Sequence, residues 1–294
     1  MIGESIIQCK KNEEDFTAVI VKVVADKSHI FIPRNESANY IITKIGCFAF
    51  YKQKSIKNIS FDDNSEIRTF EEKAFYLSSL EYISIPRTVE RIESECFSEC
   101  KNLKTVNIQE NSNLIYLGES IFNNTSIESL TIPEKLSKIS FSLFEGTPKL
   151  NSIKISPKNK LFSYYKKEMI IGKNNQNEKV FTNLLFVRRN IEKIIIPSFI
   201  KCIKSYAFDS CKKLKSVEFE NNSNLSYIGN YAFNNISLKS ISFPSGCKHF
   251  IYKEFTNFQT IEYLGDTIYC LFEEIFCKSN LLFVSFPNCK YIKI

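Results

Sequence analysis

Seven phenylalanines recur at a regular spacing along this chain of 294 residues: Phe50, Phe75, Phe97, Phe122, Phe144, Phe208 and Phe233. The first five are separated by 25, 22, 25 and 22 residues, and the last two are again 25 residues apart. Self-similarity at a period of roughly 20 to 50 residues is typical of proteins in which one small unit stacks on the next. The spacing therefore predicts a solenoid of stacked coils.

Two kinds of connector alternate along the repeats and account for the two spacings. Some units carry an Asn-Ser pair after their apolar strand, at Asn64-Ser65, Asn111-Ser112 and Asn222-Ser223. The other units carry a proline at the same point, at Pro86, Pro133, Pro197 and Pro244. Asn favours turns, whereas proline lacks an N–H group and ends a strand ladder. We also expect tight corners that use the conformational freedom of glycine at Gly46, Gly118 and Gly229.

Each unit contains the strand pattern of one aliphatic residue, two variable residues, then apolar, variable, apolar. Examples are Leu80-x-x-Ile83-x-Ile85 and Leu214-x-x-Val217-x-Phe219. The last three positions alternate as in a half-buried strand. One unit cannot bury its own apolar face, so neighbouring units must stack into a continuous core.

The repeat resembles a known family. The pattern Ile-Gly-x-x-Ala-Phe-x-x-Cys-x-x-Leu-x-x-Ile-x-Ile-Pro is similar to the treponema-type leucine-rich repeat of BspA-like proteins, with close copies at 203–214 and 228–233 and a resemblance over roughly 15–250. It implies a leucine-rich-repeat solenoid: a right-handed coil, mostly β, with a parallel β-sheet on one face and turns, 3₁₀ or short extended segments on the other. Family members are commonly surface or secreted proteins of host-associated bacteria and parasitic protists that bind proteins.

The regular spacing is interrupted between Phe144 and Phe208, which are 64 residues apart. Apolar segments on both sides of the polar turn 172–178 predict a β-hairpin there. We expect a single solenoid domain over 1–294. Its predicted parts are an N-terminal cap or lead-in at 1–40, repeats at 41–156, an island with the hairpin at 157–190, repeats at 191–246 and degenerate C-terminal repeats or a cap at 247–294.

No motif supports catalysis. The chain has no Gly-rich phosphate loop, no Gly-x-Ser-x-Gly and no His-Glu-x-x-His. Ten cysteines stand against two histidines without any Cys-x-x-Cys pair, which favours buried free thiols over disulfides or zinc. The net charge of +7 is dispersed and no nucleic-acid-binding motif accompanies it. We therefore expect a non-enzymatic protein with no cofactor, no metal and no specific nucleic-acid partner.

Function should lie on the exposed face of the sheet, in two columns that flank the inward-facing residue of each strand. The candidate partner-binding residues are Asn58, Ser60, Tyr82, Ser84, Thr105, Asn107, Ser129, Thr131, Ser152, Lys154, Lys193, Ile195, Ser216, Glu218, Ser240 and Ser242. Eight strands about 4.8 Å apart form a strip of roughly 35 Å. Short hydroxyl residues also fit crowded ladders for structural reasons. We therefore expect the non-hydroxyl members Tyr82, Lys154, Lys193, Ile195 and Glu218 to decide partner choice.

Two functional classes remain open. The first is a BspA-like surface or secreted adhesion module that binds a host or matrix protein. The second is an intracellular scaffold that binds a cytosolic protein through the same face. Residues 1–15 lack the apolar segment of a secretory signal, and nowhere do about 18 apolar residues run together, which predicts no membrane span. We expect a monomer in either case.

Overall fold

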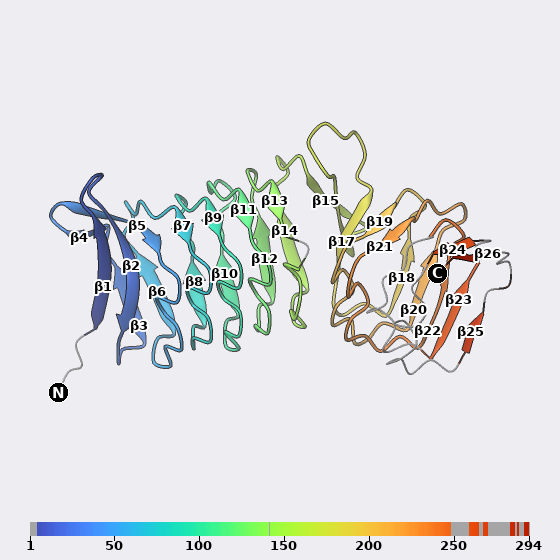
Figure 1. Cartoon of the computed structure of the whole chain (residues 1–294), viewed down its shortest axis with the longest axis horizontal. Helices are drawn as coiled ribbons and strands as arrows, with labels where there is room; N and C mark the ends of the chain where they lie inside the picture. Colours follow the sequence, from blue (N-terminus) through green and yellow to red (C-terminus); the bar gives the residue numbers. More distant parts are fainter. Residues whose placement is uncertain are drawn as a thin grey trace. The chain divides into compact units, whose positions relative to one another are not determined.

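The computed structural model describes residues 5–140, 142–247, 259–264, 267–269, 283–285, 287 and 291–293. The chain divides into two compact units, Met1–Asn159 and Lys160–Ile294. In both units the described residues form strands and turns and contain no helix (Figure 1). The prediction of a leucine-rich-repeat solenoid built from parallel sheets is confirmed. The single-domain organisation and its expected boundaries stay a prediction.

The first unit begins with an antiparallel pair, β1 (Ile6–Asn12) and β2 (Thr17–Val24). β2 then pairs in parallel with β5 (Tyr40–Ile45), which also holds the short antiparallel strand β4 (Asn35–Ser37). Ala18, Ile20 and Val23 of β2 are buried, whereas Val21 and Val24 are exposed. The pair thus closes the apolar end of the stacked coils.

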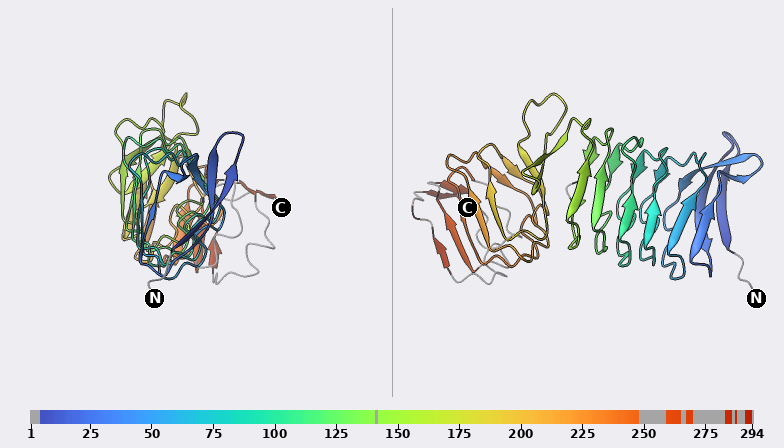
Figure 2. Two further views of the ribbon diagram at one scale, coloured as in Figure 1. Left: turned by 90° about the vertical axis from the view of Figure 1, so that its left-hand side faces the viewer. Right: turned by 180° about the vertical axis from the view of Figure 1, so that it is seen from behind.

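Two parallel sheets run along the rest of the first unit. One is six-stranded and contains β3 (His29–Ile32), β6 (Asn58–Phe61), β8 (Tyr82–Ser84), β10 (Thr105–Asn107), β12 (Ser129–Ile132) and β14 (Ser152–Ile155). The other continues from β5 through two-residue strands: β7 (Thr69–Phe70), β9 (Arg91–Ile92), β11 (Tyr116–Leu117) and β13 (Lys138–Ile139). Figure 2 shows the successive strands of the six-stranded sheet side by side from behind. The predicted short extended segments opposite the main sheet are these two-residue strands.

The repeat phenylalanines form a buried ladder between the two sheets. Ring centroids are 4.8 Å apart for Phe50 and Phe75, 5.0 Å for Phe75 and Phe97, and 5.9 Å for Phe97 and Phe122, with interplanar angles of 23°, 13° and 6°. All four side chains are at most 1% exposed. Identical rings in identical slots explain why one residue type marks the repeat.

The second unit starts with three antiparallel strands in the segment where the repeat spacing is interrupted. They are β15 (Phe162–Tyr165), β16 (Met169–Gly172) and β17 (Asn183–Val187). β17 continues in parallel into β19 (Cys202–Ile203) and β21 (Tyr227–Ile228). Two parallel sheets then contain β18 (Lys193–Ile196) with β20 (Ser216–Phe219), and β22 (Ser240–Phe243) with β23 (Thr260–Tyr263) and β25 (Phe283–Ser285). A further parallel pair is β24 (Thr267–Tyr269) with β26 (Tyr291–Lys293). The ladder recurs, with Phe208 and Phe233 centroids 4.8 Å apart.

Left-handed backbone recurs on both sides of the repeat phenylalanine. Two residues before it, φ is positive at Phe48, Lys73, Glu95, Ser120, Tyr206 and Tyr231. Two residues after it, φ is positive at Lys52, Leu77, Glu99, Asn124, Gly146, Ser210 and Asn235. A left-handed non-glycine residue costs roughly 1–2 kcal/mol. Lysine, glutamate and leucine carry no sequence signal for this conformation, so sequence reasoning missed it.

The left-handed positions direct every second amide of the turn toward the next coil. In the coil of Phe75 these bonds join Lys73 N to Ser94 O, Phe75 N to Cys96 O and Leu77 N to Ser98 O, at 2.9–3.1 Å. The amides of Ala74 and Tyr76, which lie between, bond locally to Glu71 O and Lys73 O. Hydrogen bonds between coils therefore offset the backbone strain.

The expected reason for the corner glycines is wrong. None of Gly46, Gly118 and Gly229 has a positive φ. A Cβ on Gly118 would lie 2.6 Å from Ser94 N, and one on Gly229 would lie 2.5 Å from Ser205 N. Glycine is needed because the backbone of the preceding coil approaches closely, not because of its conformational freedom.

The Asn-Ser connectors do form turns, but the serine makes the bond that they share. Ser65, Ser112 and Ser223 each accept a hydrogen bond at Oγ from the amide two residues later, at 3.3–3.4 Å. Of the three asparagines, only Asn222 has a left-handed backbone. The recurring structural role therefore belongs to the hydroxyl group.

Candidate functional site

The candidate face of the first unit consists of the outward-facing residues of its six-stranded sheet. The register aligns one column of side chains as His29, Asn58, Tyr82, Thr105, Ser129 and Ser152. The second column contains Phe31, Ser60, Ser84, Asn107, Thr131 and Lys154. Every one of these residues is exposed or half-buried, while the residue between the two columns is buried in each strand. The ten residues predicted for this unit therefore share one face.

Sequence reasoning missed His29 and Phe31, which extend both columns by one strand. The signal was present in the alternation His29-Ile30-Phe31-Ile32 before Pro33. Ile30 and Ile32 are buried, whereas Phe31 is 52% exposed. Their strand pairs with Asn58–Phe61 residue for residue. The lead-in thus contributes to the face as well as to the cap.

Polar side chains on this face bond from strand to strand. His29 Nε2 lies 2.9 Å from Ser60 Oγ, and Asn107 Nδ2 donates to Ser84 Oγ at 3.0 Å. Lys154 Nζ pairs with Glu110 at 2.5 Å. Of the two non-hydroxyl residues predicted here to select a partner, Lys154 is therefore neutralised locally, while Tyr82 is 41% exposed.

The face of the second unit contains the other six predicted residues. Lys193 aligns with Ser216, and Ile195 aligns with Glu218. Ser240 and Ser242 align with Thr260 and Glu262 of β23. Ile195 is 48% exposed. The predicted strip of eight strands stays a prediction, because five of those strands lie in the first unit and three in the second.

Thr260, Glu262 and Ser285 also belong to the face of the second unit and were missed. They lie in the segment expected to be degenerate, where no repeat phenylalanine marks the coil. The usable signal was the alternation Thr260-Ile261-Glu262-Tyr263, of which Ile261 and Tyr263 are buried. A strand can therefore keep its alternation after the rest of the repeat pattern is lost.

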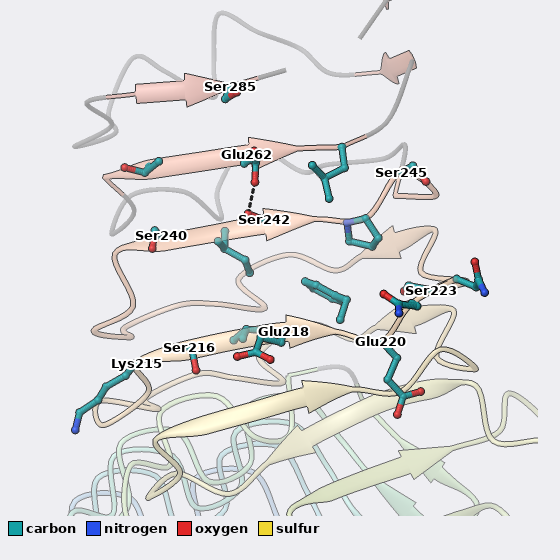
Figure 3. A pocket seen from close by; sticks show the side chains of 18 residues that line it. Lys215, Ser216, Glu218, Glu220, Ser223, Ser240, Ser242, Ser245, Glu262 and Ser285 are labelled. Atoms are coloured by element: carbon teal, nitrogen blue, oxygen red, sulfur yellow. Dashed lines mark hydrogen bonds between the residues drawn. The ribbon is translucent and has the colours of Figure 1, made fainter. Parts of the chain in front are cut away.

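A hollow of about 840 Å³ lies along the second unit's face, over β20, β22, β23 and β25 (Figure 3). Hydroxyl groups line its floor, and they come from Ser216, Ser240, Ser242, Thr260 and Ser285. Three carboxylates join them: Glu218, Glu220 and Glu262. Ser242 Oγ donates to Glu262 at 2.5 Å, and Glu220 accepts a hydrogen bond from the Ser198 amide at 2.8 Å. β20 and β22 belong to different sheets, so the hollow crosses the place where the ladder is interrupted.

The described residues contain neither a cluster of metal-ligating side chains nor a disulfide. No group of three His, Cys, Asp or Glu side chains among them could hold a metal ion. The seven cysteines in the described part are free, and Cys96, Cys100, Cys211 and Cys247 are buried. Burial raises the pKa of Cys100 to about 11 and that of Cys247 to about 12. Such thiols stay protonated at neutral pH, and the nucleophile would be the thiolate.

Comparison with known proteins agrees with this geometry. The family model described as BspA type leucine rich repeat region matches residues 35–151 and 179–294 in 6 copies, more than half of the chain. The chain belongs to the BspA-type leucine-rich repeat family. As in the sequence pattern, the matched copies lie on both sides of the interruption.

Three bacterial proteins of known structure are similar to this BspA-type chain. The pneumococcal vaccine antigen PcpA is 22% identical with a TM-score of 0.70, over 99% of this chain and 81% of that one. A leucine-rich cell surface protein from Faecalibacterium prausnitzii is 20% identical with a TM-score of 0.60, over 98% and 92%. A leucine-rich repeat protein of Treponema pallidum is 15% identical with a TM-score of 0.51, over 78% and 86%. At these identities the likeness shows the fold.

No curated protein matches this BspA-type chain in sequence. In the part of the chain that the structure describes, no helix is long and apolar enough to cross a membrane.

Proposed function

We propose that this BspA-type chain is a non-enzymatic protein-binding module, displayed on the cell surface or secreted, that adheres to a host or matrix protein as a monomer. The observation that carries the proposal is the exposed face of its parallel sheets. The side chains in the two aligned columns of each unit do not pack into the core. They include Phe31, Tyr82 and Ile195, which are 41–52% exposed. Aromatic side chains such as those of Phe31 and Tyr82 are enriched at protein interfaces.

The proteins of similar fold support the surface assignment. One is described as a cell surface protein and another as a vaccine antigen, a term that fits an accessible protein. The family itself is an interaction module whose repeats present extended surfaces.

The face is tested with the purified protein against immobilised matrix proteins and host cell-surface proteins. Y82S/K193E changes the face, and Y227S/K138E changes the short strands β21 and β13 as a matched control. Tyr82 and Tyr227 are both 41% exposed, and both lysines are exposed. We expect Y82S/K193E to weaken binding at least tenfold and Y227S/K138E to leave it unchanged. Equal effects of the two pairs would show that the sheet face is not the binding surface.

An intracellular scaffold is the second candidate, and the free cysteines favour it. None of the seven described cysteines forms a disulfide, and disulfides are common in exported proteins. A membrane-impermeant lysine reagent applied to intact source cells separates the two candidates. A surface protein is labelled before lysis, whereas an intracellular scaffold is labelled only afterwards. For a secreted protein the medium is assayed in parallel.

A further inference from the structure

The hollow on the second unit's face differs in charge from the rest of the chain. The chain as a whole carries +7, yet Glu218, Glu220 and Glu262 line the hollow with one lysine, Lys215, at its rim. Lys215 is already paired with Glu192, at 2.7 Å. Among the described residues, Glu218 and Glu262 have no ion-pair partner. Some carboxylates beside the first unit's sheet are paired, such as Glu81 with Lys57 at 3.1 Å.

The arrangement of these carboxylates restricts what the hollow can bind. They do not converge on one point, since no group of three acidic, histidine or cysteine side chains in the described part could hold a metal ion. Glu218 and Glu262 stand on β20 and β23, with the serines of β22 between them (Figure 3). Because β20 and β22 are not paired, these positions are at least two strand spacings, about 10 Å, apart. Separate carboxylates at this distance suit separate cationic groups rather than one ion.

The floor between the carboxylates suits a peptide backbone. Serine and threonine hydroxyls both donate and accept hydrogen bonds, so they can bond the N–H and C=O groups of an extended chain. In an extended chain only side chains an even number of residues apart share a face, and four residues span about 13 Å, so two side chains four residues apart can reach both carboxylates. Lysine and arginine are the side chains that carboxylates bind by charge-assisted hydrogen bonds.

We propose that the hollow over β20, β22 and β23 binds an extended segment of the partner protein that carries two Lys or Arg side chains four residues apart. This inference rests on the proposed protein-binding function and names the chemistry of the partner. Glu218 and Glu262 bind the two cationic groups, and the serines of β22 contact the backbone between them. The local negative charge gives selectivity against acidic segments, because like charges repel across the interface.

The probe is an unlabelled nine-residue peptide of Ser, Thr and Val with two Arg residues four positions apart, titrated into the 294-residue protein by calorimetry. A matched peptide replaces both Arg residues by citrulline, which keeps the shape and removes the charge, and a third replaces them by Glu. We expect binding of the Arg peptide only, and weaker binding as salt rises because exposed charges are screened. Equal binding of the citrulline or Glu peptide would overturn the proposal.

The matched protein variants are E218Q/E262Q and E128Q/E134Q, which change the net charge equally. Glu128 and Glu134 are exposed and belong to the first unit. Gln keeps an oxygen that can accept the Ser242 hydroxyl, so we expect both variants to fold as shown by circular dichroism. E218Q/E262Q should weaken binding of the Arg peptide at least tenfold, while E128Q/E134Q should not change it. An unchanged affinity in E218Q/E262Q would contradict the assignment.

Failure of this inference can be told from failure of the proposed function. If the Arg peptide does not bind but Y82S/K193E still weakens binding to a host or matrix protein, the face is correct and the partner chemistry of the hollow is wrong. If the Arg peptide does not bind and Y82S/K193E changes binding to no host or matrix protein, both proposals are wrong. Binding of the Arg peptide that E218Q/E262Q weakens supports the inference whichever host protein is bound.

Discussion

A repeat phenylalanine inside the ladder stabilises its coil through neighbours on both sides. Phe97 is fully buried between Phe75 and Phe122. We expect F97A to lower the free energy of unfolding of the first unit by about 3–5 kcal/mol, because the cavity and the lost ring contacts add. Phe31, 52% exposed, is the control, and F31A should cost less than about 0.5 kcal/mol. The chain has no tryptophan, so urea unfolding is followed by circular dichroism; equal costs would refute the buried ladder.

The slot three residues after the phenylalanine takes small side chains that bond a turn carbonyl. Thr125 and Thr147 donate to the carbonyls of Phe122 and Phe144 at 2.7 and 2.8 Å. In the same slot, Cys100 Sγ donates to Phe75 O at 3.0 Å. The cysteines of the repeat are therefore buried donors with a structural role, and threonine is the natural replacement at Cys100.

Cys100 should make the stability of the first unit fall at alkaline pH. Burial raises its pKa from 9.0 to about 11 in the folded protein. Below pH 9 the thiol is protonated in both states. Between pH 9 and 11 the unfolded state releases the proton and the folded state keeps it, so unfolding is favoured by up to about 3 kcal/mol. C100T should lack this component when unfolding free energies are compared across that range. Parallel profiles of the two proteins would show that Cys100 does not contribute.

At the scale of the element, the turn around each phenylalanine combines backbone strain with hydrogen bonds between coils. Left-handed residues such as Lys73 and Leu77 cost backbone energy, yet they direct amides into the next coil. Gly118 allows the backbone of the preceding coil to approach, since its missing Cβ would meet Ser94 N. The connection between coils thus depends on the backbone as much as on the apolar core.

Adding one methyl group at Gly118 should test the contribution of the backbone separately from that of the apolar core. In G118A the new Cβ would lie 2.6 Å from Ser94 N, which the coils must relieve by moving apart, and we expect a loss of about 1–3 kcal/mol. G246A is the control, because its Cβ would come no closer than 3.0 Å to Leu225 O. Thermal unfolding of both variants measures the difference. A smaller loss in G118A than in G246A would rule out the close approach as the reason for glycine.

At the scale of the whole molecule, the sequence predicted what repeats and missed what does not. The phenylalanine spacing predicted the stacked coils, and the strand alternation placed all sixteen candidate residues in exposed or half-buried positions. The half-buried Glu262 was missed because its coil has lost the phenylalanine. Left-handed Lys73 escaped because its conformation is imposed by hydrogen bonds to another coil, which no local pattern encodes. The spacing of the repeats likewise does not indicate whether the face binds a partner.

The division after Asn159 predicts that residues 1–159 fold without the rest of the chain. The Asn159 side chain closes this unit, since its Nδ2 donates to Pro133 O at 2.8 Å and to Leu136 O at 3.0 Å. We expect the isolated fragment to show a cooperative thermal transition by circular dichroism. N159A in that fragment should lower its stability by about 1–2 kcal/mol, because both carbonyls lose a donor. N151A removes an exposed bond to Lys149 O and should cost less. An unfolded fragment would mean that residues 1–159 need the rest of the chain in order to fold.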